Sequence, residues 1–139
     1  MKAVLDSSAA LASVLPEPLQ AKAIRLLDDY RGGLHDLLAP DIFPIESLNG
    51  IVKAERQRRI RNGYALWQGI MSDSPVYHPY LPLLPRAFAI STQTLSAVYD
   101  CVYVALAELE ICEMVTADDR LVRNLQSRFP FVIHLSALP

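Results

Sequence analysis

The chain has 139 residues, of which 52% are apolar and 20% are charged, and its formal net charge is −2. These values are typical of one folded domain with a sizeable core, and they exclude an intrinsically disordered chain. The small negative charge argues against a passive nucleic-acid binder that relies on neutralising phosphates. It does not argue against an enzyme that meets phosphates through metal ions held by acids. We therefore expect a single domain over residues 1–139.

The two cysteines, Cys101 and Cys112, flank a helical stretch. Eleven residues of helix would separate them by about 16 Å, which is too far for a disulfide. The N-terminus reads Met-Lys followed by a short apolar run, which is not a signal peptide. No apolar run approaches the roughly 20 residues of a membrane span. The sequence therefore predicts a cytoplasmic protein without a membrane segment and with two reduced cysteines.

Strand-like and helix-like segments alternate along the chain, without linkers or repeats. In chain order we expect strand 3–5, helix 7–15, helix 19–30, strand 37–39, helix 40–60, helix 64–71, strand 76–78, an irregular helix 83–92, helix 96–110 capped by Ser96, strand 114–116, helix 118–128 and strand 131–133. Short apolar strands separated by helices favour a parallel sheet covered on both faces. We therefore predict an α/β fold, a three-layer α/β/α sandwich around four to five parallel strands.

Acidic residues follow two of these strands. Asp6 comes directly after the first strand, and Asp118 follows the fourth after one intervening residue. Ligands of open parallel sheets bind beyond the carboxyl ends of the strands, near the point where the strand order reverses. If strands one and four are neighbours, these two carboxylates face one crevice. Glu46 and Asp100 lie early in helices, where they could reach the same rim.

Each acid also has an ordinary explanation. Asp6 could cap a helix, Asp118 could be a charge favoured at a helix N-terminus, and Glu46 could be solvated. Asp100 is harder to explain because its neighbours are mainly apolar, no lysine or arginine lies nearby in sequence, and an unpaired buried carboxylate is costly. A shared oxygen-preferring cation such as Mg²⁺ or Mn²⁺ would relieve the repulsion between clustered carboxylates. The three histidines are scattered, and no zinc-type spacing occurs.

Four segments together resemble PIN domains, and most closely the VapC toxins of toxin–antitoxin pairs. They occur in the family's order and span nearly the whole chain: VLDSSAAL at 4–11, FPIESLNGI at 43–51, VYDCVYVALAE at 98–108 and VTADDRL at 115–121. The resemblance implies a quartet of catalytic acids that binds one or two Mg²⁺ or Mn²⁺ ions, matched here by Asp6, Glu46, Asp100 and Asp118.

The same resemblance suggests auxiliary residues. Ser8 and Thr116 match hydroxyl positions that line the family's site, Asn49 matches a supporting polar position, and Asp119 adjoins the fourth acid. Two departures from the family's pattern are Cys101, where alanine is usual, and Ala97, where a small hydroxyl is common. Neither departure removes an acid, so we expect an active enzyme.

The implied activity is that of a Mg²⁺- or Mn²⁺-dependent endoribonuclease, the toxin of a VapBC-type pair, which hydrolyses RNA with a metal-activated water. Its implied partners are RNA, a second copy of the chain, and a small antitoxin that inserts a segment with an arginine into the acidic groove. The apolar composition suits a homodimer. A basic cluster either holds the RNA backbone or is a solvated helix end: Lys53, Arg56, Arg58, Arg59 and Arg61.

Two other functions are open on the sequence. The first is a catalytically idle PIN-like module that binds RNA or protein, against which the intact acid quartet argues. The second is a metal-dependent phosphatase, but a phosphatase of the DxDxT type would need an aspartate where Ser8 stands. Tyr64, Trp67 and Tyr99 could stack on bases, although core or dimer packing is the more common role of such side chains.

Overall fold

The computed structural model describes residues 1–139, which form five strands, seven α-helices and two short 3₁₀ turns. The strands are β1 (Lys2–Leu5), β2 (Asp36–Pro40), β3 (Val76–His78), β4 (Glu113–Thr116) and β5 (Val132–His134). The helices are α1 (Ser7–Leu11), α2 (Gln20–Arg31), α3 (Phe43–Arg56), α4 (Gly63–Ser72), α5 (Leu84–Thr94), α6 (Val98–Glu110) and α7 (Asp119–Leu125). The 3₁₀ turns are η1 (Leu81–Leu83) and η2 (Leu135–Ala137).

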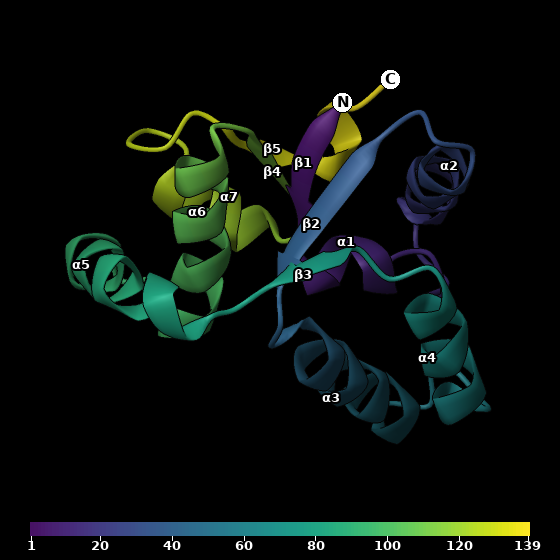
Figure 1. Ribbon diagram of the computed structural model, residues 1–139. Coiled ribbons are helices and arrows are strands. Elements are labelled where there is room, and N and C mark those ends of the chain that lie inside the picture. The colour runs from purple at the N-terminus through teal and green to yellow at the C-terminus, as the bar shows by residue number, and fades with distance from the viewer.

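Helices cover the sheet on both faces (Figure 1). Helices α1 to α4 lie on one face, and α5, α6 and α7 lie on the other, with the sheet between them. The predicted three-layer α/β/α sandwich is therefore confirmed. The five predicted strands are all present, each within one or two residues of its expected bounds.

All five strands are parallel, in the order β3-β2-β1-β4-β5. Strand β1 is central, and Val4 pairs with Leu38 of β2 on one side and with Met114 of β4 on the other. The chain first builds outward from β1 through β2 to β3, and then returns to add β4 and β5 on the opposite side. The switch point of the sheet therefore lies between β1 and β4, as the expected site requires.

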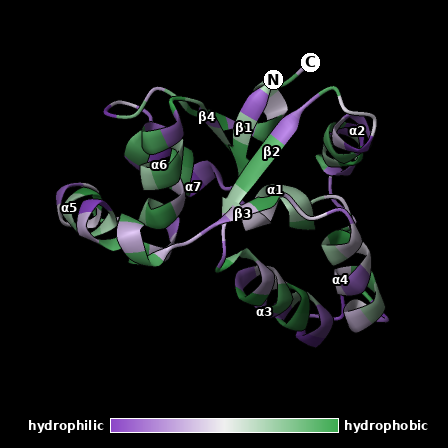
Figure 2. Cartoon of the chain, in the orientation of Figure 1, coloured by the Kyte–Doolittle hydropathy of each residue, from purple (hydrophilic) through white to green (hydrophobic).

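The core explains why strands this short are stable. Ala3, Val4 and Leu5 have no exposed surface, because helices cover both faces of β1. Every residue of α6 from Cys101 to Ala107 is buried as well. Figure 2 shows the corresponding green, apolar colouring on the strands and on much of α6, whereas the C-terminal end of α3 is purple.

Helices α1 and α3 approach each other closely at Gly50. A Cβ atom at this position would lie 2.3 Å from Cδ1 of Leu11, so a larger residue there would collide with α1. Helix α1 in turn rests on the sheet through small side chains, among them Ala9 and Ala10, which are 1% exposed. This close packing fixes the distance between the first turn of α3, which carries Glu46, and the end of β1.

Several predicted helix ends are wrong. The helix expected over 7–15 ends at Leu11. Two residues further on, the hydroxyl of Ser13 donates to the backbone carbonyl of Ala10 at 2.6 Å. The helix expected to reach residue 60 ends at Arg56, and Arg58 adopts a left-handed conformation with φ of 57°. The last helix ends at Leu125, three residues before its expected end.

The proline-rich segment and the expected cap of α6 also differ from expectation. Helix α5 is regular, because Pro85 lies in its first turn, where no backbone donor is needed. Ala97, in extended conformation, is the N-cap of α6, and no side chain caps that helix. Ser96 does not cap it: its carbonyl accepts a hydrogen bond from Ser91 Oγ at 2.6 Å, and its own Oγ has no partner.

Both cysteines are free, as predicted from their spacing. Cys101 is buried and Cys112 is half-buried. None of the helices has both the length and the apolar character that crossing a membrane requires.

The buried face of α3 can be tested with one substitution. Phe43→Ala is expected to lower the free energy of unfolding by about 3–5 kcal/mol, because the side chain is fully buried and its loss leaves a cavity. The matched control is Ile45→Ala, at a position 66% exposed in the same helix, for which a change of no more than about 0.5 kcal/mol is expected. Urea unfolding measures both, and equal losses would contradict the assigned burial.

Candidate functional site

Four different elements bring the four predicted acids to one edge of the sheet. Asp6 follows β1, Glu46 and Asp100 lie in the first turns of α3 and α6, and Asp118 is the N-cap of α7. Burial, followed by the charges of Asp6, Glu46 and Asp118, raises the pKa of Asp100 to about 7. The four carboxylates therefore lie close enough to repel one another at the switch point between β1 and β4.

Hydroxyl groups hold Asp6 in place. The residue is 5% exposed, and its Oδ2 accepts hydrogen bonds from Ser8 Oγ at 2.6 Å and from Thr116 Oγ1 at 2.7 Å. The two hydroxyl oxygens are themselves 3.1 Å apart. Burial nevertheless raises the pKa of Asp6, because the hydroxyl donors only partly offset the loss of hydration. No side chain donates to Oδ1, which leaves this oxygen available to a ligand.

Backbone donors from the β4–α7 connection extend this network. The amide of Ala117 donates to Ser8 Oγ at 3.0 Å, and the amide of Asp118 donates to Thr116 Oγ1 at 3.1 Å. Ser8 and Thr116 thus tie the end of β1 to the end of β4. The ordinary explanation of Asp6 as a helix cap is wrong: it stands at the N-cap position of α1, but its side chain makes no capping hydrogen bond.

Asp118 does lie at a helix N-terminus, as its ordinary explanation required, but only one of its carboxylate oxygens interacts with the helix. Its Oδ1 accepts from the amides of Arg120 at 3.0 Å and Leu121 at 3.1 Å, which caps α7. Its Oδ2 makes no hydrogen bond with the protein. Capping therefore fixes the orientation of the carboxylate and leaves the second oxygen free to act at the rim.

Glu46 is half-buried, and burial raises the pKa of its carboxyl group. Its Oε1 is fully buried and has no hydrogen-bond partner, whereas Oε2 is accessible. The residue beside it was missed in the sequence: Tyr103, whose ring is fully buried and whose hydroxyl also lacks a partner. The sequence feature that could have identified Tyr103 is its position three residues after Asp100, which places both residues on the same side of α6.

Two of the expected auxiliary residues are not tied to the acids by any contact. Asn49 lies one turn beyond Glu46 on α3, but its side chain is exposed and makes no hydrogen bond. Asp119 Oδ1 lies 2.9 Å from His134 Nε2, in a geometry that does not form a hydrogen bond. His134 belongs to β5, so Asp119 is turned towards the outer strand.

The four acids offer the type of ligand atom that a hard divalent cation prefers. All four groups supply carboxylate oxygens, and no lysine or arginine forms an ion pair with any of them. No three His, Cys, Asp or Glu side chains lie close enough together to form a ready-made metal site. The carboxylates would therefore have to turn towards one another to hold an ion.

Two hollows flank Asp118, and both include Asp118 and Arg120 in their walls. The first has a volume of about 360 Å³, and its eight lining residues are Leu95, Ser96, Ala97, Asp100, Asp118, Arg120, Leu121 and Asn124. Arg120 is exposed, and its side chain has no acidic partner. The acids at the rim could hold a cation, and a guanidinium lies beside them. Both a bound cation and a guanidinium can contact phosphate, so the arrangement suits a phosphate-bearing chain.

Known proteins resemble this chain over almost its full length. The family model of the PIN domain matches residues 3–124. Ribonuclease VapC3 of Pyrobaculum aerophilum is 32% identical over 139 aligned residues, which cover 96% of this chain and 98% of that protein. Ribonuclease VapC9 of Mycobacterium tuberculosis is 32% identical over 135 residues, which cover 94% of this chain and 96% of that protein.

Solved structures show the same fold. The crystal structure of PAE2754 from Pyrobaculum aerophilum aligns with a TM-score of 0.69 at 19% identity, covering 98% of this chain and 93% of that one. A toxin–antitoxin complex from Klebsiella pneumoniae contains a chain that aligns with a TM-score of 0.61 at 15% identity, covering 96% of this chain and 97% of that one. At these identities the likeness supports the architecture alone.

The raised pKa of Asp100 predicts how stability depends on pH. The folded protein retains the proton of this carboxyl to about pH 7, whereas the unfolded chain releases it near the ordinary value of 3.8. The folded state therefore binds more protons in this interval, so stability falls as the pH rises through it.

Asp100→Asn removes this charge. We expect it to raise the free energy of unfolding at about pH 8 by on the order of 1 kcal/mol, with a smaller gain at about pH 5. Urea unfolding in the presence of a chelator measures the difference, with the exposed Asp36→Asn as control. A gain that is independent of pH, or equal in the control, would contradict the assigned repulsion.

Proposed function

The chain belongs to the PIN domain family, and we propose that it is a Mg²⁺- or Mn²⁺-dependent endoribonuclease, the toxin of a VapBC-type toxin–antitoxin pair. The observation that carries this proposal is the rim of four carboxylates, brought together from four elements without a cationic side chain among them. The relatives named as ribonucleases, at 32% identity over nearly the full length, support RNA as the substrate. The acids match the family's motifs position by position.

The chain's own contribution to the chemistry is the placement of oxygen ligands. When bound, Mg²⁺ or Mn²⁺ supplies the charge that activates a water for attack on the phosphodiester and stabilises the leaving oxygen. Asp6, held by Ser8 and Thr116, offers Oδ1. Asp118, held by the first amides of α7, offers Oδ2. Glu46, in the first turn of α3, and Asp100, in the first turn of α6, complete the set.

Arg120 is placed to hold the substrate. It lines both hollows beside Asp118 and has no acidic partner, so its guanidinium is free to bind the phosphate next to the scissile one. The basic cluster at the end of α3 is more distant: Lys53, Arg56 and Arg58 are exposed, and Arg59 pairs with Glu17 at 3.3 Å. We assign this cluster the weaker role of attracting RNA.

The aromatic candidates for base stacking divide into two groups. Trp67 is engaged within the fold, since Nε1 donates to the carbonyl of Pro44 at 3.1 Å and to Ser47 Oγ at 3.2 Å. Its ring lies 5.5 Å from that of Tyr64, centroid to centroid. Tyr99 is 65% exposed and precedes Asp100, so it is the aromatic side chain best placed to meet a base.

Metal-dependent RNA cleavage tests the proposal. The wild type is expected to bind Mn²⁺ saturably in calorimetry and to cleave a pool of total RNA only when Mg²⁺ or Mn²⁺ is present. Asp6→Asn combined with Asp100→Asn is expected to abolish Mn²⁺ binding and to lower cleavage at least about a hundredfold, the upper end of what loss of an outer metal partner costs.

The matched control is Asp41→Asn. Asp41 follows β2 at the same edge of the sheet, but its carboxylate accepts the amide of Tyr80 at 2.9 Å and is not one of the four acids. This variant should cleave RNA as the wild type does. If the wild type binds no Mn²⁺ and cleaves no RNA, the idle binding module becomes the better description. Metal-dependent hydrolysis of a phosphomonoester without RNA cleavage would favour the phosphatase.

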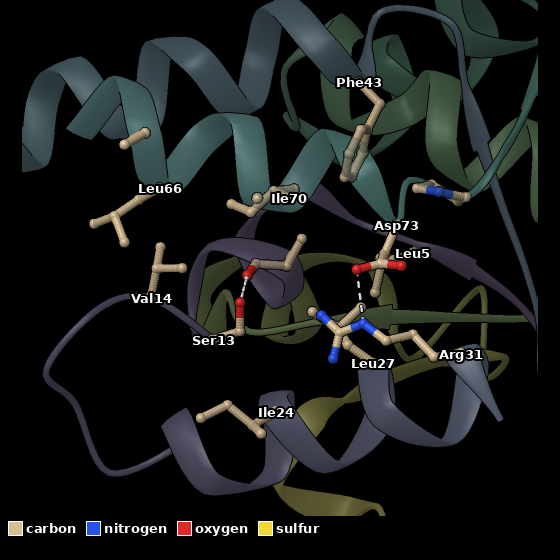
Figure 3. Close-up of a pocket in the computed structure, with 14 residues that line it drawn as sticks. Leu5, Ser13, Val14, Ile24, Leu27, Arg31, Phe43, Leu66, Ile70 and Asp73 are labelled. Carbon is tan, nitrogen blue, oxygen red and sulfur yellow. Dashed lines mark hydrogen bonds and ion pairs between the residues drawn. The ribbon is translucent and has the colours of Figure 1, made fainter. Parts of the chain in front are cut away.

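An apolar hollow offers a place for the proposed antitoxin. Figure 3 shows this hollow between α2 and α4, with α1 behind it. Its volume is about 260 Å³, and nine of its fourteen lining residues are hydrophobic, Ile24, Leu27, Leu66 and Ile70 among them. An ion pair between Arg31 Nε and Asp73 Oδ2, 2.7 Å apart, joins α2 to the end of α4 on one wall. The hollow reaches Leu5 and Phe43, which precede two of the acids, so one bound segment could cover both it and the rim.

The antitoxin and the proposed homodimer are tested together by the solution mass of the protein purified from its source. We expect a mass above that of one chain and a small co-purifying protein. Ile24→Glu should release the small protein without loss of RNA cleavage, because Ile24 is 43% exposed and lines the hollow. Leu109→Glu, at a position 67% exposed and outside the hollow, is the matched control. A wild-type mass equal to one chain would count against both partners.

A further inference from the structure

Two buried polar atoms beneath the acids have no hydrogen-bond partner. One is the hydroxyl of Tyr103, a residue with no exposed surface at all. The other is Oε1 of Glu46. Leaving a buried hydroxyl or carboxylate oxygen unpaired is costly, so two such atoms in the same part of a core call for a physical reason.

The two groups lie on helices of different layers, and each affects the other: burial raises the pKa of Glu46, and the Tyr103 hydroxyl partly offsets this rise. Burial, followed by the charges of Glu46 and Asp6, raises the pKa of Tyr103, so the phenol keeps its proton and remains a donor. No hydrogen bond joins the two groups in this structure, so the proton of Tyr103 is still available to Glu46.

The backbone gives Tyr103 a fixed relation to the acids. It lies three residues after Asp100 on α6, hence on the same side of the helix, and α6 packs against β1, β2 and β4. Its ring is among the largest fully buried side chains of the protein, so the hydroxyl cannot swing away from the site. Glu46, by contrast, has one oxygen in the core and one that is accessible.

We propose that Tyr103 is a positioning residue for the metal-binding acids: when a cation binds, its hydroxyl donates to Oε1 of Glu46 and holds Oε2 towards Asp6 and Asp100. This inference rests on the proposed metal-dependent function and adds to it a residue outside the acid quartet. A carboxylate that is ionised and turned towards a cation needs a donor on its buried oxygen, and Tyr103 is the fully buried donor beside it. Partners of this kind orient the ligands of many metal sites.

The test compares Tyr103→Phe with wild type and with Tyr80→Phe, a matched control at a tyrosine that is 39% exposed and lies outside α6, just before η1. Calorimetric titration with Mn²⁺ is expected to give an affinity about tenfold weaker for Tyr103→Phe, and an unchanged affinity for Tyr80→Phe. Thermal unfolding with a chelator present should show an unchanged or raised midpoint for Tyr103→Phe, because this variant removes a buried hydroxyl that has no partner.

A spectroscopic readout separates positioning from packing. When Mn²⁺ is added, the ultraviolet difference spectrum of the wild type is expected to contain a tyrosine band that Tyr103→Phe lacks and Tyr80→Phe retains. Equal Mn²⁺ affinity in wild type and Tyr103→Phe would overturn the inference while leaving the proposed nuclease intact. A lowered thermal midpoint of Tyr103→Phe with a chelator present would overturn it too, since the hydroxyl would then be structural. Failure of the wild type to bind Mn²⁺ would remove the proposed function and this inference with it.

Discussion

The parallel pairing of β1 with β4 is the constraint on which the candidate site depends. It brings Asp6 beside Thr116, a residue 110 positions later, and the contact is closed by the 2.7 Å hydrogen bond from the Thr116 hydroxyl to Asp6. The amide of Asp6 continues the ladder by donating to the carbonyl of Val115 at 3.0 Å. Because β1 is the central strand, any change in this register would move the acid out of the crevice and would also disturb the core.

The site stores electrostatic repulsion, which the rest of the fold must offset. Asp6, Glu46 and Asp100 all have raised pKa values with burial as the largest cause, and no cationic side chain relieves them. Such an arrangement lowers the stability of the protein and is retained where function requires it. The buried apolar core, to which α1 contributes Ala9 and Ala10, supplies the stability that offsets this cost.

Much of this arrangement could be predicted from the sequence because its signals are local. Each strand is an apolar run, and the acids that follow strand one directly and strand four after one residue must meet once those strands pair. Helix ends were less predictable: Arg58 reverses the chain with a left-handed conformation that no adjacent glycine announces. The cap of α6 was missed because Ser96 is chemically suited to capping, yet its side chain is buried without a partner.

Orientation was the other source of error, because it is decided by tertiary contacts. Asp119 adjoins the fourth acid in sequence, but a helix begins between the two and turns Asp119 towards His134. Tyr103 was overlooked for the opposite reason. In an apolar helix such as α6, a tyrosine is expected to be one more core residue. Its hydroxyl becomes a candidate for a role at the site only once the fold places Glu46, from a different layer, near it.

The capping bonds of Asp118 bear on how descendants of this protein would diverge. A lineage that lost its nuclease activity would still gain stability from a residue at position 118 that caps α7, so aspartate, asparagine or serine would persist there for reasons unrelated to chemistry. Asp6 caps nothing, and the hydrogen bonds from Ser8 and Thr116 only partly offset the cost of its burial, so relaxed selection would replace it early. Within a set of diverged sequences, the residue at position 6 would therefore distinguish active from inactive members better than the residue at position 118.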